Sequence, residues 1–318
     1  MDPSLEPPAG YRPRPPTPEE APDIAGLVAA SDAALGQPPS VSEDLLRGFW
    51  ARPRFALATD AWGVERDGVL VGYADVWDMD PTRASAMAVV HPDHTGRGIG
   101  TYLASLVEER AVQKVSKEAS LATATLTQDE AAARLLIARG YVFARRFWHM
   151  EGGVATLPPA HPAGIRLRHL DPGHDLPVVH RVLEETFEDH WDFSPTPFDE
   201  FLERDIHRDD FDPGLWILAV DDDEIVGVLA GTAHSDRGWV NNLGVLGSHR
   251  GRGIASALLR ESFVEFGGRG LSLVRLNVDS ENVTNAVALY ERVGMRVVNS
   301  YDLWSRAVGG AVPPGATP

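Results

Sequence analysis

Two short stretches of this chain are nearly identical, and they decide how it is organised. RGRGIA occupies residues 250–255, and TGRGIG occupies residues 95–100. Each follows a run of strand-forming residues and leads directly into a helical pattern. Glycines permit a tight turn, so that successive backbone amides point into one concavity at the start of a helix. Both stretches therefore predict a phosphate-binding loop.

The spacing of the glycines excludes two other phosphate-binding loops. No Lys-Ser or Lys-Thr pair follows them, as a nucleotide-hydrolysing P-loop requires. The dinucleotide fingerprint needs a third Gly or Ala, and this chain has Thr101 and Ser256 at those positions.

The two loops belong to a domain-sized repeat with an offset of 155 residues. Val90 and Val245 share this offset, as do the Val-Gly pairs at residues 71–72 and 226–227. Both halves show the same order of expected elements. A short strand and two helices precede a hairpin, and a strand then leads into the glycine loop, followed by a helix, a strand, a helix and a closing strand. We predict domains at residues 10–152 and 165–306, a linker at residues 153–164 and a tail at residues 307–318.

Composition narrows the function classes. The net charge is −17, which disfavours nucleic acid as a partner. It would favour cationic small molecules, and a role in solubility alone is the stronger alternative. The chain has no cysteine, so disulfides and thiolate chemistry are excluded. No apolar run is long enough to span a membrane and no secretory signal is visible, so we expect a cytoplasmic protein. The acidic run at residues 221–224 predicts a solvated turn, and we expect no metal site.

Two motifs of the second half occur together in one known family. Residues 250–255 match the pattern Arg/Gln-x-x-Gly-x-Gly/Ala. Residues 282–295, NVTNAVALYERVGM, match an Asn-containing segment that leads to Leu-Tyr-Glu-Arg-x-Gly-Phe/Met. In these motifs the chain resembles the GNAT superfamily of acyl-CoA-dependent N-acyltransferases. The resemblance covers nearly all of residues 165–306, whereas residues 11–150 match the element order and part of the motif.

The resemblance implies an α/β (α+β) fold of two tandem GNAT-like domains, each a mixed, mostly antiparallel twisted sheet flanked by helices. It also implies acetyl-CoA as the acyl donor and the primary amine of a small molecule as the acceptor. The implied cofactor contacts lie on the strand before the loop, in the loop itself and in the Asn-containing segment: Leu243, Gly244, Val245, Arg250, Gly251, Arg252, Gly253, Ile254, Ala255, Asn282 and Asn285.

Acyl transfer from a thioester needs a neutral amine and a proton for the departing sulfur. The resemblance brings Tyr290 near that sulfur, where a phenol could donate the proton; packing of an aromatic ring behind a helix is the alternative. Many family members carry a glutamate on the strand before the loop. Alignment on Val245 gives Asn241 at that position, and an asparagine could hold a water that relays the proton.

The family uses the segment between the first two helices for the acceptor. Here it mixes carboxylates with aromatic rings, which suits an amine with an apolar body. An ordinary polar loop with an aromatic anchor remains the alternative. The candidate acceptor residues are Glu188, Asp189, His190, Trp191 and Asp192.

The first half keeps the glycines and has lost polar groups elsewhere. Thr95 stands in place of Arg250, Leu136 in place of Tyr290, and Ala86 in place of Asn241. We therefore expect a degenerate domain that mainly shapes the second half. A second acetyl-CoA could still bind there, at Val90, Gly96, Arg97, Gly98, Ile99 and Gly100.

The leading hypothesis is an N-acetyltransferase whose second half is catalytic. One alternative is mycothiol synthase, which shares the tandem layout. Those enzymes bring a glutamate into the start of the strand where this chain has the segment at residues 237–239, RGW. The other alternative is a non-catalytic protein that binds acyl-CoA or a small molecule.

Overall fold

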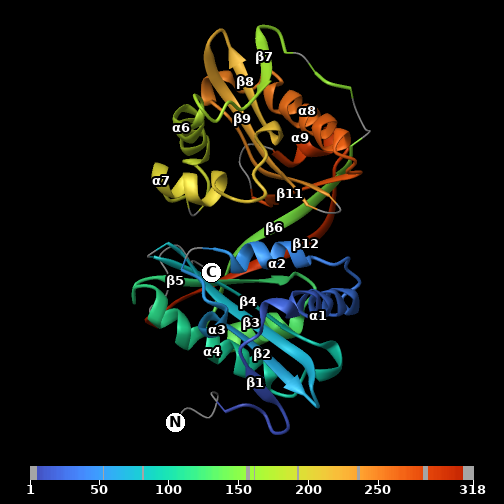
Figure 1. Ribbon diagram of the computed structural model, residues 1–318, viewed down its shortest axis with the longest axis vertical. Coiled ribbons are helices and arrows are strands. Elements are labelled where there is room, and N and C mark those ends of the chain that lie inside the picture. Colours follow the sequence, from blue (N-terminus) through green and yellow to red (C-terminus); the bar gives the residue numbers. More distant parts are fainter. Residues whose placement is uncertain are drawn as a thin grey trace. The chain divides into compact units, whose positions relative to one another are not determined.

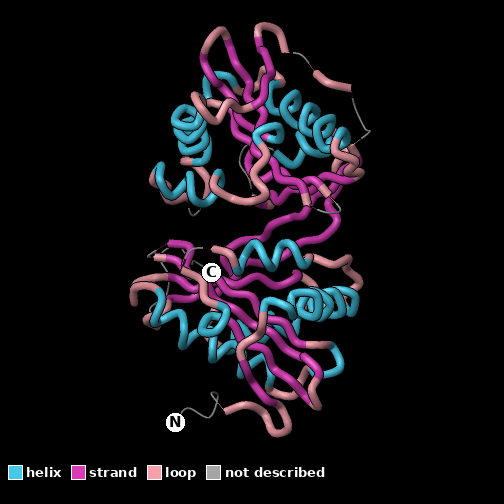
Figure 2. The backbone as a smooth tube through the Cα atoms, viewed as in Figure 1, coloured by secondary structure: helices cyan, strands magenta, loops and turns pink. Residues whose placement is uncertain are grey.

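The computed structural model describes residues 6–52, 54–80, 82–154, 158–160, 162–191, 193–234, 237–281 and 286–310. Its internal contacts divide the chain into two units (Figure 1). The first unit comprises Met1–Arg146 with Ser300–Pro318, and the second unit comprises Phe147–Asn299. Each unit is a sheet flanked by helices (Figure 2).

In the first unit the sheet has the order β1-β2-β3-β4-β5-β12. Among the described residues of this sheet, β4 and β5 pair in parallel, whereas β1–β2, β2–β3, β3–β4 and β5–β12 pair antiparallel. The elements are β1 (Arg12–Arg14), α1 (Ala21–Ala34), α2 (Glu43–Trp50), α3 (Leu57–Asp60), β2 (Ala61–Arg66), β3 (Val69–Asp80), β4 (Arg83–Val90), α4 (Ile99–Lys114), β5 (Ser120–Leu126), α5 (Glu130–Ala138), the beginning of β6 (Val142–Gly153) and the end of β12 (Arg296–Ala307).

The second unit repeats this plan with the order β6-β11-β10-β9-β8-β7; β10 pairs with β11 in parallel, and the other neighbouring strands pair antiparallel over their described residues. The mixed, mostly antiparallel α/β fold predicted for both halves is therefore confirmed. The remaining elements are β7 (Ile165–His169), α6 (Leu176–Phe187), α7 (Phe198–Phe201), β8 (Trp216–Asp221), β9 (Glu224–Ala233), β10 (Gly238–Val245), α8 (Ile254–Gly268), β11 (Leu273–Asp279) and α9 (Ala286–Arg292).

The order of elements predicts that the closing strand of each half completes the sheet of that half, and this prediction is wrong. β6 pairs antiparallel with β11, and its Met150 is buried in the core of the second unit. β12 pairs antiparallel with β5, and its Trp304 is buried in the core of the first unit. A strand buries the same alternating side chains against either of two similar cores, so its sequence pattern does not reveal which sheet it joins. The boundaries of the two units consequently differ from the predicted boundaries at residues 152 and 165.

Helices cover both faces of each sheet. In the second unit, a Cβ on Gly227 would contact Ile254 and Leu258 of α8 at 3.3 Å. A Cβ on Gly244 would lie only 2.2 Å from Oγ1 of Thr186 on α6. The helices α6 and α8 therefore lie on opposite faces of the sheet (Figure 1). Gly244 is required because α6 packs directly against the backbone of β10 there.

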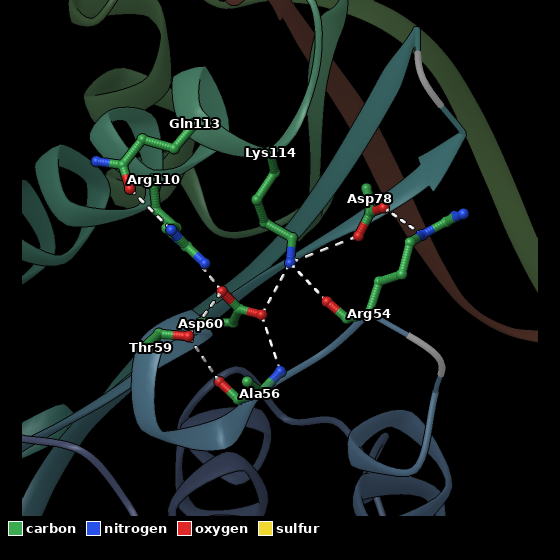
Figure 3. A network of polar contacts seen from close by, with 8 residues as sticks. All are labelled: Arg54, Ala56, Thr59, Asp60, Asp78, Arg110, Gln113 and Lys114. Carbon is green, nitrogen blue, oxygen red and sulfur yellow. Dashed lines mark hydrogen bonds and ion pairs between the residues drawn. The ribbon is translucent and has the colours of Figure 1, made fainter.

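A buried ionic network ties α3 to α4 and β3 in the first unit (Figure 3). Asp60 is fully buried, and its carboxylate lies 2.8 Å from both Arg110 Nε and Lys114 Nζ. Lys114 Nζ also lies 3.5 Å from Asp78. Burial alone would raise the pKa of Asp60, but hydrogen bonds from Lys114, the Ala56 amide and Arg110 outweigh it and hold the pKa below its usual value.

Removal of one partner from this network should strongly destabilise the first unit. Lys114→Met leaves the carboxylate of Asp60 buried with one side-chain cation fewer, and breaking a buried ion pair in this way costs about 3–5 kcal/mol. Urea unfolding would measure the loss. Lys117→Met is the matched control, because Lys117 is exposed and is the only other lysine. Equal effects of the two substitutions would show that the network does not stabilise the unit.

Candidate active site

Strands β10 and β11 part in the middle of the second sheet. Their parallel pairing runs from Gly238 opposite Val274 to Val240 opposite Leu276, and the register gives β10 no partner on β11 beyond that point. On its other side, β10 stays paired with β9 as far as Val245. Along this stretch, in the described part of the chain, the β11-facing edge of β10 is not used for strand pairing. Such an edge can pair with an extended ligand.

A β-bulge lies where the two strands part. The β9–β10 register shifts between Val240 and Asn242, which leaves Asn241 as the extra residue. A bulge bends the strand and re-aims the neighbouring side chains, and bulges are frequent beside active sites. The exposed Asn241 side chain donates from Nδ2 to Oγ1 of Thr232 at 3.2 Å.

The first unit parts its strands in the same way but has no bulge there. β4 pairs with β5 from Arg83 to Ala86, and its pairing with β3 runs without a shift from Ser85 to Val90. The last residue paired in parallel is therefore Ala86 in one unit and Val240 in the other. The alignment that placed Ala86 opposite Asn241 is wrong at this position, because Asn241 is an inserted residue.

The two glycine loops have the same backbone conformation. Gly251 and Gly253 have φ of 79° and 81°, and Gly96 and Gly98 have φ of 71° and 84°. Gly253 and Gly98 each cap the helix that follows, α8 or α4. A Cβ built on Gly251 or Gly253 would meet no described atom within 4 Å beyond the neighbouring residues of the chain, so neither glycine is packed against another element there.

The arginines of the second loop have different surroundings. Arg252 Nη1 lies 2.6 Å from Asp221, and this ion pair lowers the pKa of Asp221. His249 Nε2 lies 3.3 Å from the same carboxylate. Arg250 donates from Nε to the carbonyl of Val245, at the end of β10. The side chain of Arg250 therefore lies by the open strand, whereas that of Arg252 is held by the acidic turn between β8 and β9.

Tyr290 lies on α9 and is 8% exposed, within the core of the second unit. Burial raises its pKa to about 12, so the phenol keeps its proton at neutral pH. Its carbonyl accepts from the amides of Val293 and Met295, and the carbonyl of Leu136 accepts from Arg139 and Tyr141 in the same way. Leu136 is thus the structural counterpart of Tyr290, as the sequence comparison of the halves predicts. Asn282 and Asn285 lie outside the described residues.

The candidate acceptor segment follows the end of α6. The His190 ring lies 4.4 Å from that of Phe187. Burial lowers the pKa of His190, while Asp279 opposes this effect and Arg250 adds to it. His190 therefore experiences the charges of Arg250 in the glycine loop and Asp279 at the end of β11, and it is neutral at pH 7.

The other residues of that segment differ in exposure. Glu188 and Asp189 are exposed, and Trp191 is 39% exposed. Asp192 lies outside the described residues. Of the candidate acceptor residues that the structure describes, His190 is the one whose pKa the charge of Arg250 shifts.

Comparison with known proteins agrees with this geometry. The model of the acetyltransferase (GNAT) family matches residues 33–141 and 179–295. A mycothiol acetyltransferase of Thermobispora bispora is 32% identical over 290 residues, which cover 87% of this chain and 93% of that relative. This chain belongs to the GNAT family of acetyltransferases.

Solved GNAT structures share the whole architecture. A GCN5-related N-acetyltransferase from Sphaerobacter thermophilus superimposes with a TM-score of 0.83 at 33% identity, over 95% of this chain and 96% of that one. A tandem GNAT protein from the clavulanic acid biosynthesis pathway has a TM-score of 0.70 at 19% identity, over 95% and 99% of the two chains, and shares the fold. The chain is therefore a tandem GNAT N-acetyltransferase.

One polar group of this GNAT enzyme escapes sequence reasoning. His149 lies on β6, opposite Asn277 of β11, and its ring packs edge-on against Trp239 of β10 at 5.9 Å. Burial lowers the pKa of His149 to about 4, and Arg275 adds to the effect. No motif could reveal this residue, because it joins the second sheet through the exchanged strand.

The described residues of the enzyme contain neither a metal-binding cluster nor a membrane-spanning helix. No group of three or more His, Asp or Glu side chains there could hold a metal ion. No helix within those residues is both long and apolar enough to cross a bilayer.

Proposed function

We propose that the second unit transfers the acetyl group of acetyl-CoA to the primary amine of a small molecule. The observation that carries this proposal is the bulged strand β10, which leaves β11 in the same unit that has Arg250 and Tyr290. The first unit has the parted strands but lacks the bulge, and Thr95 and Leu136 replace the two side chains.

The donor would lie along the open edge of β10. Its pantetheine would form hydrogen bonds with the backbone of residues 243–245, and its pyrophosphate would accept from amides of residues 250–255. The left-handed conformations of Gly251 and Gly253 support this assignment, because they direct successive amides into one concavity. Asn282 or Asn285 would position the pantetheine arm.

The reaction requires the attacking amine to lose one proton and the departing sulfur to gain one. The amine nitrogen attacks the thioester carbonyl, a C–N bond forms, and the C–S bond breaks to release the thiolate. Tyr290 would give its proton to that sulfur, consistent with a phenol that is protonated at neutral pH. The amine would lose its proton to a water held by Asn241, with the neutral ring of His190 as the nearby acceptor.

The acceptor would bind on the α6 face of the sheet. Exposed Glu188 and Asp189 would attract its ammonium form, and Trp191 offers a partly exposed apolar surface for its body. Asp192 belongs to the same proposed segment. The net charge of −17 favours a cationic acceptor over an anionic one.

Thiol release from acetyl-CoA tests the proposal on the full chain. We expect a panel of primary amines (amino sugars, arylalkylamines and polyamines) to contain at least one that raises thiol release, with an equal amount of N-acetyl product by mass spectrometry. Release that is independent of every amine would make the protein a thioesterase and would contradict the proposal.

A second candidate acceptor follows from the relatives. Several are named mycothiol acetyltransferases at about 30% identity, and they align with most of this chain. The unacetylated form of mycothiol therefore belongs in the amine panel. The RGW segment at residues 237–239 argues for a different acceptor, because the start of β10 lacks the glutamate expected of those enzymes. If kcat/KM for the unacetylated form of mycothiol is well above that for every other amine, this compound is the acceptor.

A further inference from the structure

The first unit contains a buried carboxylate at the point where its own strands part. Asp75 of β3 is 2% exposed and pairs with Met87 of β4. Met87 directly follows Ala86, the last residue that β4 pairs with β5. Asp75 therefore lies beside the place that corresponds to the bulge of the second unit, although β4 itself carries no polar group there.

The two oxygens of this carboxylate differ in their side-chain partners, and the backbone of Met87 also forms a hydrogen bond with the carboxylate. The Tyr73 hydroxyl donates to Oδ2 of Asp75 at 2.6 Å, and Trp50 Nε1 donates to the Tyr73 hydroxyl at 3.0 Å. Oδ1 of Asp75 is buried and has no hydrogen-bond partner among the described residues. Burial without a partner is costly for a carboxylate, so such an atom is a mark of a missing ligand or of function.

Two stacked aromatic rings, those of Phe49 and Trp77, lie next to this carboxylate. The rings of Phe49 on α2 and Trp77 on β3 are stacked, with centroids 5.6 Å apart and planes 17° apart. Both side chains are half-buried. Trp77 follows Tyr73 and Asp75 at every second position of β3, so all three point to the face that α2 covers.

A positively charged side chain of the protein, Arg52, lies over these two rings. The guanidinium carbon of Arg52 is 4.4 Å from the centre of the Phe49 ring and 5.6 Å from that of Trp77. Arg52 is exposed, and it is the positive charge near enough to oppose the rise in the pKa of Asp75. The two components of an amine site, an anion and a cation-binding aromatic pair, therefore lie together here, with the buried carboxylate of Asp75 beneath and the exposed Arg52 guanidinium over the rings.

We propose that the first unit has a small-molecule site of its own on this face, which binds a primary amine with a flat apolar body. The ammonium donates to Oδ1 of Asp75, and the body stacks on Phe49 and Trp77 in place of the Arg52 guanidinium. The site is distinct from the proposed acceptor site of the second unit. The first unit is then a ligand-binding domain and not only a structural one.

Titration calorimetry on the full chain with 2-phenylethylamine as the probe tests this proposal. The probe combines an ammonium with one flat ring. At pH 8 we expect saturable binding that Asp75→Asn weakens by about tenfold or more, because a charge-assisted hydrogen bond is lost. Asp67→Asn is the matched control, since Asp67 is 92% exposed on the turn before β3, and it should bind as the wild type does.

Arg52→Ala should change the affinity for the probe in the opposite direction to Asp75→Asn. It removes the competing cation, so it should tighten binding of the probe several-fold. Burial raises the pKa of Asp75 to about 7, with Tyr73 and Arg52 as the groups that face it, so wild-type affinity should rise between pH 6 and 8 as the carboxylate ionises.

Two results would overturn the proposal. One is wild-type binding that is absent in the millimolar range, or that is unchanged by Asp75→Asn. The other, which decides the matter even where Asp75→Asn does not fold, is an Arg52→Ala variant that binds the probe no more tightly than the wild type. Binding to the acceptor site of the second unit would persist in Asp75→Asn, so failure of this proposal is distinguishable from failure of the proposed function.

Discussion

Gly253→Val is expected to abolish acetyl-CoA binding to the second unit. Gly253 has φ of 81°, a left-handed conformation that a β-branched residue adopts only with strain of about 1–3 kcal/mol. The loop would relax and turn its amides away from the pyrophosphate. A Cβ at this position meets nothing within 4 Å, so the fold itself should survive.

Calorimetry with acetyl-CoA would measure a loss in affinity of about 100-fold or more, since strain and lost amide hydrogen bonds add. Gly36→Val is the matched control. Gly36 also has a positive φ of 71° and open space around its Cβ, but it lies after α1, in the first unit and outside both glycine loops. Unchanged affinity and stoichiometry in Gly253→Val would contradict the loop assignment.

Tyr290→Phe should lower kcat while leaving the affinity for acetyl-CoA nearly unchanged. The substitution removes only the hydroxyl, and general acids contribute about 100- to 10,000-fold. The pKa of Tyr290 is about 12, well above that of an ordinary thiol, so proton transfer to the thiolate is favourable only while the amine loses its own proton. We therefore expect a loss at or somewhat below the low end of that range, about 10- to 100-fold.

Kinetics and stability measured together separate this role from simple packing. A catalytic hydroxyl predicts a fall in kcat with an unchanged melting temperature. A packing role predicts an unchanged kcat. Turnover of Tyr290→Phe at the wild-type rate would remove Tyr290 from the mechanism. Tyr301→Phe is a control, because Tyr301 is another tyrosine whose pKa is raised by burial, and it lies on β12 in the first unit.

Local chemistry made much of the fold predictable. The Asp-Gly turn at residues 67–68 and the loop glycines take the positive φ that their sequences predict. The repeat of 155 residues gave the same order of elements in both halves. Turns, caps and alternating strands depend on neighbouring residues, and a single sequence records these directly.

Features that depend on pairing between residues far apart in the sequence could not be predicted from local patterns. The exchange of β6 and β12 places Met150 and Trp304 in cores that their own halves do not form. The bulge at Asn241 is a one-residue insertion, and an alignment without gaps hides it. Asp75 could not be predicted by comparing β4 with β10, because its carboxylate reaches this place from the neighbouring strand β3.

The most direct test of the central claim, that the second unit alone carries the transferase centre, is thiol release by Gly98→Val compared with Gly253→Val. Both residues have the same left-handed conformation, with φ of 84° and 81°, at the same place in their loops. Assays should use the full chain, because each sheet is completed by a strand from the other half. We predict a loss of about 100-fold or more for Gly253→Val and of less than about threefold for Gly98→Val. Equal losses in two folded variants would contradict the account.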